Sequence, residues 1–130
     1  MFYYTKVFFS SLDSLERIVP WMLSHVPKAL LEQAGANRVE VAFDELITNI
    51  YEHAYGKKLL PIFIKLKLDE IKFHCEIYDK GPAFNPLKHS KEEYSDEFAV
   101  GGYGLTFMKA VFKNLNYEFK HGMNCISFEI

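Results

Sequence analysis

Apolar side chains recur along this chain with two different periods, which predict an alternation of strands and helices. Residues 2–9 are mostly aromatic or β-branched, as is typical of a strand. From Leu12 to Gln33 the apolar positions follow a helical period, and Pro20 and Pro27 predict that this helix is kinked or broken. Residues 34–37 combine a glycine with an asparagine, so we expect them to end that helix and begin the next one.

The next helix contains the stretch 41–55 and carries polar groups beside its apolar face. Glu45 and Asn49 are four residues apart, so the helical period places them one turn apart on the flank of that face. Glu52 falls on the same flank, whereas Asp44 points elsewhere. A solvated helix edge and a base beside a metal ligand both fit this pattern, and the helix alone does not decide between them. The apolar positions of the face are Val39, Phe43, Leu46, Ile50 and Ala54.

Two alternating stretches follow this helix. In residues 62–68 and 73–77 apolar side chains occupy every second position, and the side chains between them are polar except at Phe63. The short link at Asp69 and Glu70 predicts that the two strands form a hairpin. Alternation of this kind predicts a sheet with one buried face, and the helices are expected to cover that face.

The last part of the chain begins with a stretch that lacks periodicity. Residues 79–104 are dominated by Gly, Pro, Asn, Ser and charged side chains, and a loop of this length in a compact domain is usually functional or disordered. A helix is expected from Leu105 to about Leu115, followed by a hairpin of residues 117–120 and 125–130. The whole pattern predicts a two-layer α/β sandwich, in which helices cover one face of a mixed, mostly antiparallel sheet.

The composition limits the class of protein. The chain has 130 residues, of which 49% are hydrophobic, so we expect one globular domain that spans residues 1–130. Its formal charge of −2 gives no reason to expect nucleic acid as a partner. Cys75 and Cys125 lie in strand-like runs and are expected to be buried free thiols. No apolar stretch approaches the roughly 20 residues that span a bilayer, and no signal sequence is recognised, so we expect a cytoplasmic protein without membrane contact.

A second motif lies at the end of a predicted strand. Asp79 and Gly81 come directly after that strand, and Ala83 and Phe84 follow them. A carboxylate there can accept a hydrogen bond from an amino group, and a glycine lets a flat ring lie against the backbone. An ordinary Asp-x-Gly turn has the same sequence, so this motif alone does not decide the function.

A third motif, a glycine cluster, precedes the last predicted helix. Gly101, Gly102 and Gly104 stand next to Leu105 and Thr106. Backbone amides at a helix N-terminus favour an anion, although a flexible loop end has the same composition. The cluster lacks the Gly-Lys-Ser/Thr of a P-loop and does not follow the first strand of a βαβ unit, so it is not a Rossmann fingerprint either.

In this order, the three motifs resemble the ATP-binding domain of the GHKL type, shared by gyrase, heat-shock-90 proteins, MutL and histidine kinases. The resemblance extends from Val39 to Phe112 and implies the Bergerat ATP-binding fold. Within that superfamily the chain most resembles the anti-sigma-factor serine/threonine kinases of bacterial partner switching. Those small domains carry Glu-x-x-x-Asn-x-x-x-His-Ala, which Glu45, Asn49 and His53 match here.

The resemblance implies a role for each motif. Glu45 is expected to be the catalytic base that takes the proton of a serine hydroxyl. Asn49 is expected to bind Mg²⁺ through its side-chain oxygen, and Asp79 to accept from the adenine amino group. His53 lies inside the nucleotide-site helix, which indicates a structural hydrogen bond and not a phosphate acceptor. The residues expected to contact ATP or its magnesium ion are Asn49, His53, Asp79, Gly81, Ala83, Phe84, Gly101, Gly102, Gly104, Leu105 and Thr106.

By the same resemblance, the expected function is that of an ATP-dependent serine-protein kinase and anti-sigma factor. Its substrate would be a serine of a STAS-type anti-sigma factor antagonist, a sigma factor would be a further partner, and a homodimer would form through the aromatic strand 2–9.

The alternative is a non-catalytic ATP- or ADP-binding module that sequesters a protein partner. Glu45 favours the kinase, because binding alone needs no base. The segment 87–100 favours the alternative, because it contains no arginine and offers only Lys88 and Lys91 as cations for the γ-phosphate. A structural sandwich without a ligand would not need the three motifs.

Overall fold

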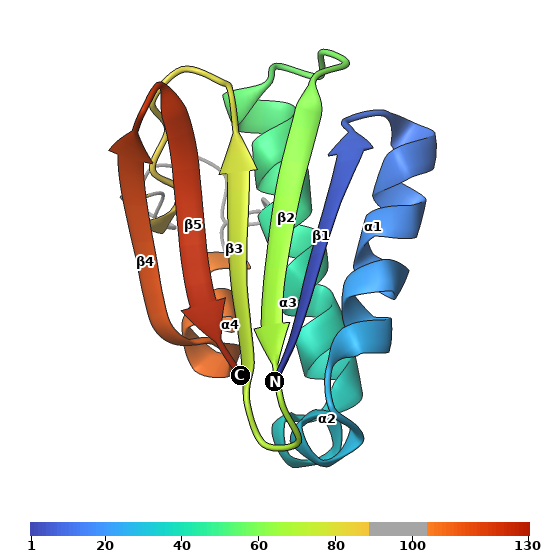
Figure 1. Cartoon of the computed structure of the whole chain (residues 1–130). Coiled ribbons are helices and arrows are strands. Elements are labelled where there is room, and N and C mark those ends of the chain that lie inside the picture. The colour runs from blue at the N-terminus through green and yellow to red at the C-terminus, as the bar shows by residue number, and fades with distance from the viewer. Residues whose placement is uncertain (89–103) are drawn as a thin grey trace.

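The computed structural model describes residues 1–88 and 104–130, which form one sheet with helices on one of its faces (Figure 1). The strands lie in the order β1-β2-β3-β5-β4. Within the described residues the strands are β1 (Phe2–Phe9), β2 (Pro61–Leu68), β3 (Phe73–Asp79), β4 (Lys113–Lys120) and β5 (Met123–Glu129). The helices are α1 (Leu12–His25), α2 (Lys28–Ala34), α3 (Ala36–Asn49), η1 (Ile50–Ala54), η2 (Pro86–Lys88) and α4 (Gly104–Val111).

The predicted two-layer sandwich is confirmed, and the pairing of the strands is more uniform than expected. All the described strand pairs are antiparallel, so the sheet is not mixed. The chain leaves β3, passes through α4 to the edge strand β4, and returns through a hairpin, so that β5 pairs with β3. This return places Asn124 opposite Asp79, although the two residues are far apart in the sequence.

The predicted break in the first helix is confirmed, whereas the last helix is shorter than predicted. Pro27 separates α1 from α2, as expected, but Pro20 lies within α1 without ending it. The helix continues past Pro20 because Ile18 and Met22 on its apolar face are fully buried in the core. The helix α4 ends at Val111 and not near Leu115, because β4 begins at Lys113.

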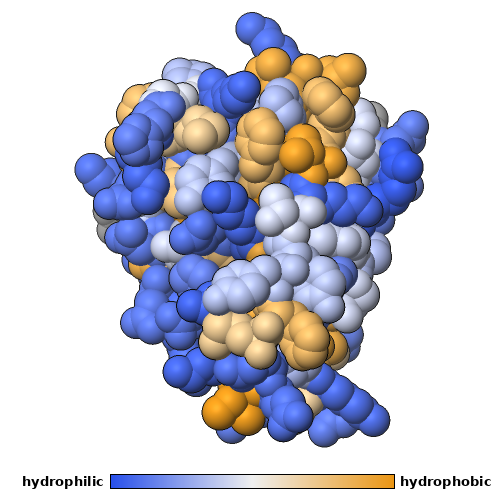
Figure 2. Space-filling view, in the orientation of Figure 1, coloured by the Kyte–Doolittle hydropathy of each residue, from blue (hydrophilic) through white to orange (hydrophobic). Residues whose placement is uncertain are grey.

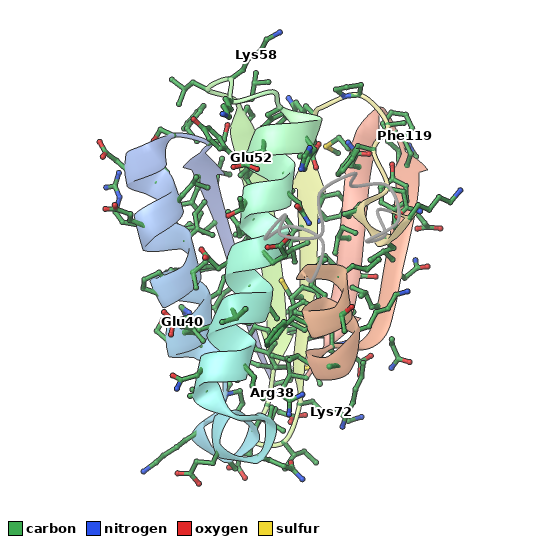
Figure 3. All side chains as sticks on the ribbon, turned by 180° about the vertical axis from the view of Figure 1, so that it is seen from behind. Arg38, Glu40, Glu52, Lys58, Lys72 and Phe119 are labelled. Atoms are coloured by element: carbon green, nitrogen blue, oxygen red, sulfur yellow. The ribbon has the colours of Figure 1, made fainter. Side chains whose placement is uncertain are left out.

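The core lies between α3 and the sheet. The ring of Phe43 on α3 is 6.1 Å from that of Phe73, 5.8 Å from that of Phe112 and 6.0 Å from that of Phe128, measured between ring centroids. The predicted apolar face of this helix is buried throughout, from Val39 to Ala54. Seen from the helical side, α3 crosses the middle of the sheet between α1 and α4 (Figure 3). Its polar flank is therefore held at a fixed position beside the core.

The opposite face of the sheet is open and of mixed character. Figure 2 shows hydrophilic residues interspersed with separate hydrophobic patches on this face.

Cys75 and Cys125 are free and buried, as expected. Among the described residues, no helix has the length and apolar character needed to cross a lipid bilayer.

Candidate functional site

The first predicted site element, the flank of α3, is formed as expected. Glu45 and Asn49 are partly buried, whereas Asp44 is exposed. Burial raises the pKa of Glu45 above its usual value of 4.5, and the negative charges of Asp44 and Glu52 raise it further. A carboxyl group with a raised pKa is a stronger base once it has lost its proton, which suits proton transfer near neutral pH.

The helix changes its geometry directly after Asn49. Residues Ile50–Ala54 form a π-helical turn, in which Tyr55 N–H donates to the carbonyl oxygen of Ile50 at 2.8 Å. The extra residue in this turn brings both Ala54 and Tyr55 to the buried side, where they are 4% and 2% exposed. Single π-turns inside α-helices are frequent at functional sites. A regular α-helical period predicts Ala54 to be buried but not Tyr55, so sequence reasoning missed Tyr55.

The second predicted element, Asp79, is buried at the end of β3 with only 4% of its surface exposed. Its Oδ1 accepts a hydrogen bond from the Gly81 amide at 2.9 Å and another from Asn124 Nδ2 at 2.8 Å. Burial raises the pKa of Asp79, and these two hydrogen bonds oppose that shift. Within the described part of the chain no group donates to Oδ2, which therefore keeps its capacity to accept from a ligand.

Gly81 joins this loop to the end of the long helix. A Cβ atom at this position would lie 2.5 Å from the carbonyl oxygen of Ala54, which is shorter than any real contact of a Cβ atom. Only glycine therefore allows the loop to approach the π-helical turn so closely. The ring of His53 also stacks on Phe84 at a centroid distance of 5.5 Å, so the first and second motifs touch.

Gly104 joins the third motif to the first. It is the first residue of α4, and a Cβ atom there would collide with the carboxyl group of Glu45. Leu105 is partly buried and Thr106 is exposed in the first turn of α4. Gly101 and Gly102, which the sequence assigned to the same motif, lie outside the described residues, as does Lys91. The structure thus places Gly104 against Glu45 on α3, and the loop after Asp79 against the end of η1 through Gly81.

Sequence reasoning missed Asn124 and Tyr117, which complete the surroundings of Asp79. Asn124 is 2% exposed and bonds to Asp79, to the Pro82 carbonyl and to the Phe84 amide. Its Oδ1 also accepts from the Tyr117 hydroxyl. The sequence placed Asn124 in the turn of the last hairpin, and no local spacing indicates a partner so far away in the chain.

The side chains of the site suit a hard cation held together with a ligand. The carboxamide oxygen of Asn49 is a type of ligand that Mg²⁺ accepts. Among the described residues, no group of three His, Cys, Asp or Glu side chains is placed to hold a metal ion. An ion bound at Asn49 would therefore take further ligands from phosphate groups or water, as is usual for Mg²⁺.

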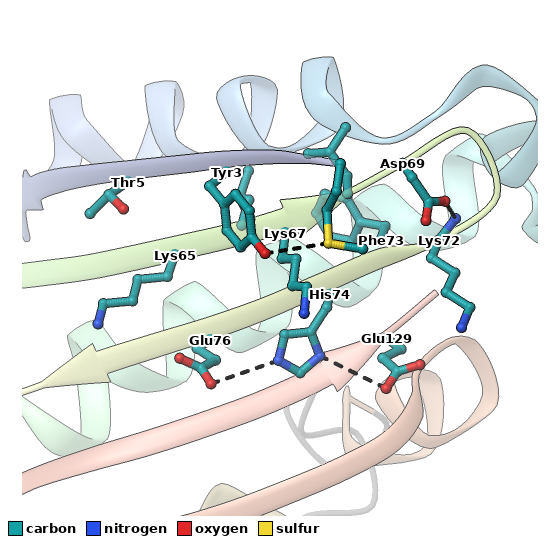
Figure 4. A pocket seen from close by; sticks show the side chains of 13 residues that line it. Tyr3, Thr5, Lys65, Lys67, Asp69, Lys72, Phe73, His74, Glu76 and Glu129 are labelled. Carbon is teal, nitrogen blue, oxygen red and sulfur yellow. Dashed lines mark hydrogen bonds and ion pairs between the residues drawn. The ribbon is translucent and has the colours of Figure 1, made fainter.

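A separate hollow of about 610 Å³ lies on the open face of the sheet, away from these motifs (Figure 4). His74 lies there between two carboxylates, with Nε2 at 3.7 Å from Glu76 and Nδ1 at 3.9 Å from Glu129. None of the residues that line the hollow belongs to the three motifs. The candidate functional site is therefore the region where the three motifs contact one another, and this hollow is not part of it.

Comparison with known proteins gives an independent indication of the class. The model of a family described as the histidine kinase-like ATPase domain matches residues 8–130 of the chain. A search of curated proteins gave no match. The matched region contains all the motif residues, including those that the structure brings together around α3.

The two glycines predict different responses to substitution. We expect Gly81→Ala to lower the free energy of unfolding by about 1–3 kcal/mol, because the added methyl group meets the rigid backbone of Ala54. Gly104→Ala should cost less, because the group that it meets is the end of the flexible Glu45 side chain. Urea denaturation of both variants measures the difference. An unfolding midpoint for Gly81→Ala equal to that of the wild type would contradict the close contact with Ala54.

Proposed function

Because this chain belongs to the histidine kinase-like ATPase domain family, we propose that it is an ATP-dependent serine-protein kinase of the anti-sigma type. Its substrate would be a serine of a STAS-type anti-sigma factor antagonist, with a sigma factor as a further partner. The observation that carries this proposal is the position of Glu45, which lies against the start of α4 and one turn from Asn49. Binding of a nucleotide alone would not require a partly buried carboxylate at that position.

In the proposed reaction, Glu45 accepts the proton of the serine hydroxyl. The serine oxygen then forms a bond to the γ-phosphorus, and the bond between that phosphorus and the β–γ bridging oxygen breaks, so ADP leaves. Asn49 would hold the magnesium ion, which neutralises phosphate charge when it is bound. The residues Gly104, Leu105 and Thr106 at the start of α4 would line the phosphate side of the site.

At the other end of the site, Asp79 would select the base. Its Oδ2 is available as an acceptor, and adenine presents an amino group where guanine presents a carbonyl oxygen. A carboxylate therefore attracts adenine and repels guanine at this position. The stacked rings of His53 and Phe84, next to Ala83, would form a wall beside the base.

A second candidate function is a module that binds ATP or ADP and sequesters a partner without phosphorylating it. The absence of arginine from the sequence segment 87–100 favours this candidate, because phosphoryl transfer profits from a cation near the γ-phosphate. The two candidates share the nucleotide site and differ only in the role of Glu45.

We also propose that the chain forms a homodimer through β1. This strand is at the edge of the sheet, and Tyr3 and Phe9 are 69% and 55% exposed on its open face. Exposed aromatic side chains on an unpaired edge are typical of an association surface. Light scattering should give twice the monomer mass of 15.2 kDa for the wild type and the monomer mass for Tyr3→Lys combined with Phe9→Lys. Phe119→Lys on the opposite edge strand is the control, and a monomeric wild type at high concentration would contradict the proposal.

The kinase proposal predicts a specific loss of rate in Glu45→Gln. This variant keeps the shape of the side chain but removes the base, so single-turnover phosphate transfer at saturating ATP should slow by about 10²–10⁴-fold. Asp44→Asn, on the exposed side of the same helix, should change the rate much less, because it removes only part of the pKa increase of Glu45 and not the base itself. Since the pKa of Glu45 is raised, the wild-type rate should increase with pH as Glu45 loses its proton, and its midpoint should lie above 4.5.

The pH profile of Glu45→Gln should lack this increase. Equal rates for the wild type and Glu45→Gln would remove the base role of Glu45. ATP binding without transfer to any antagonist by the wild type would favour the sequestering module.

A further inference from the structure

The side chain of Asn124 makes an unusual number of contacts with one loop. From β5, its Nδ2 donates to Asp79 Oδ1 at 2.8 Å and to the Pro82 carbonyl at 2.9 Å, and it lies 3.3 Å from the Gly81 carbonyl. Its Oδ1 accepts from the Phe84 amide at 2.9 Å and from the Tyr117 hydroxyl. One carboxamide thereby connects the strand β5 with most of the segment 79–84.

These contacts use the full hydrogen-bonding capacity of the Asn124 side chain. A carboxamide has two N–H donors and one oxygen with two lone pairs, and each of them has a partner here. The orientation of the group follows from its partners. The reverse orientation would set its oxygen against the Pro82 carbonyl and its NH₂ group against the Phe84 amide. Asn124 therefore acts on the loop and has no hydrogen-bonding group left for a ligand.

Tyr55 holds the beginning of the same loop from the other side. Its hydroxyl donates to the Pro61 carbonyl and accepts from the Lys80 amide at 2.7 Å. This contact depends on the π-helical turn, which brings Tyr55 to the buried side. The loop is thus fixed on one side by Tyr55 and on the other by Asn124, before any ligand is bound.

We propose that Asn124 is a positioning residue of the nucleotide site: it fixes the segment 79–84 and occupies Oδ1 of Asp79, so that Oδ2 is the oxygen left to accept from the base. This inference rests on the proposed nucleotide binding and extends it to a residue in the last strand. Fixing the loop in advance removes the entropy cost of ordering it when the ligand binds. Loss of Asn124 should therefore weaken binding although the residue does not touch the nucleotide.

The first experiment needs no ligand and measures amide hydrogen exchange of the purified chain. In the wild type, the amides of Gly81 and Phe84 should be protected, since each donates to the cluster around Asn124. Asn124→Ala should increase their exchange rates selectively. Ser127→Ala is the matched control, because Ser127 lies on the same strand but on the open face, opposite Glu76. Unchanged protection of Phe84 in Asn124→Ala would overturn the proposal.

The second experiment measures the affinity for ATP by calorimetry as a function of pH. We expect Asn124→Ala to weaken binding about 10- to 100-fold, since it removes hydrogen bonds to a charged group. Asn124→Asp places a second carboxyl group next to Asp79. At low pH the pair shares a proton, which can replace the lost N–H donor, whereas at higher pH both groups are ionised and repel each other. The ratio of its dissociation constant to that of the wild type should therefore rise with pH between about 5 and 8.

Other titratable groups near Asp79 do not explain such a dependence. The pKa values of Tyr55 and Tyr117 are raised above 10 by burial, so both stay neutral in this range. His53, whose ring stacks on Phe84, is present in both the wild type and the variant, so the ratio compares proteins that differ only at residue 124. A purely structural defect would weaken binding by the same factor at every pH.

The outcomes separate this inference from the proposed function. If the wild type binds ATP and Asn124→Asp binds it with the wild-type affinity at all pH values, Asn124 does not position the loop, and the nucleotide site stands. If Asn124→Asp fails to fold at neutral pH, the hydrogen exchange and the ATP affinity of Asn124→Ala test the proposal instead. A wild type that binds no nucleotide overturns the proposed function, and the inference with it.

Discussion

The buried carboxylate of Asp79 is the group on which the arrangement of the site depends. A carboxylate that is only 4% exposed must be compensated by hydrogen-bond donors, or its charge is lost. Asn124 Nδ2 and the Gly81 amide supply those donors to one oxygen, which requires β5 to pair with β3 and the loop to bend back over the helix. The absence of a side chain at Gly81 then allows the loop to touch the Ala54 carbonyl. The pairing of β5 with β3, the loop 79–84 and the end of η1 therefore all meet around the carboxylate of Asp79.

A second contact connects the other end of the site. Glu45 lies against Gly104, so the start of α4 cannot carry a side chain without displacing the carboxyl group. A phosphate bound near this helix start would lie close to a carboxylate, and the two like charges would repel each other. A divalent cation at Asn49 would relieve that repulsion, which supports the proposal that a base and a metal ligand occupy successive turns of one helix. Burial raises the pKa of Glu45, and repulsion by nearby carboxylates raises it further, so its negative charge is already disfavoured at this position.

The sequence predicted the elements of the site better than the contacts between them. The flank of α3 was predictable because Glu45 and Asn49 precede the π-helical turn and follow the regular helical period. Tyr55 was not, because one extra residue in that turn alters which side chains are buried. Asn124 was not, because its partner lies in another strand and local spacing carries no information about strand order. The sheet proved wholly antiparallel among the described strands, and α4 proved shorter than expected, because β4 begins earlier than its alternation suggested.

We propose that these contacts form one site for ATP and magnesium, and titration of the purified wild-type chain with nucleotide tests this proposal most directly. Calorimetry should show that ATP binds, that Mg²⁺ strengthens the binding, and that GTP binds far more weakly. Asp79→Asn is the matched variant, since it retains the shape of the side chain but presents an amino group to the adenine amino group. We predict that its affinity for ATP is strongly reduced while its thermal unfolding shows an intact fold. Equal affinity of the wild type for ATP and GTP, or unchanged affinity of Asp79→Asn for ATP, would contradict the account.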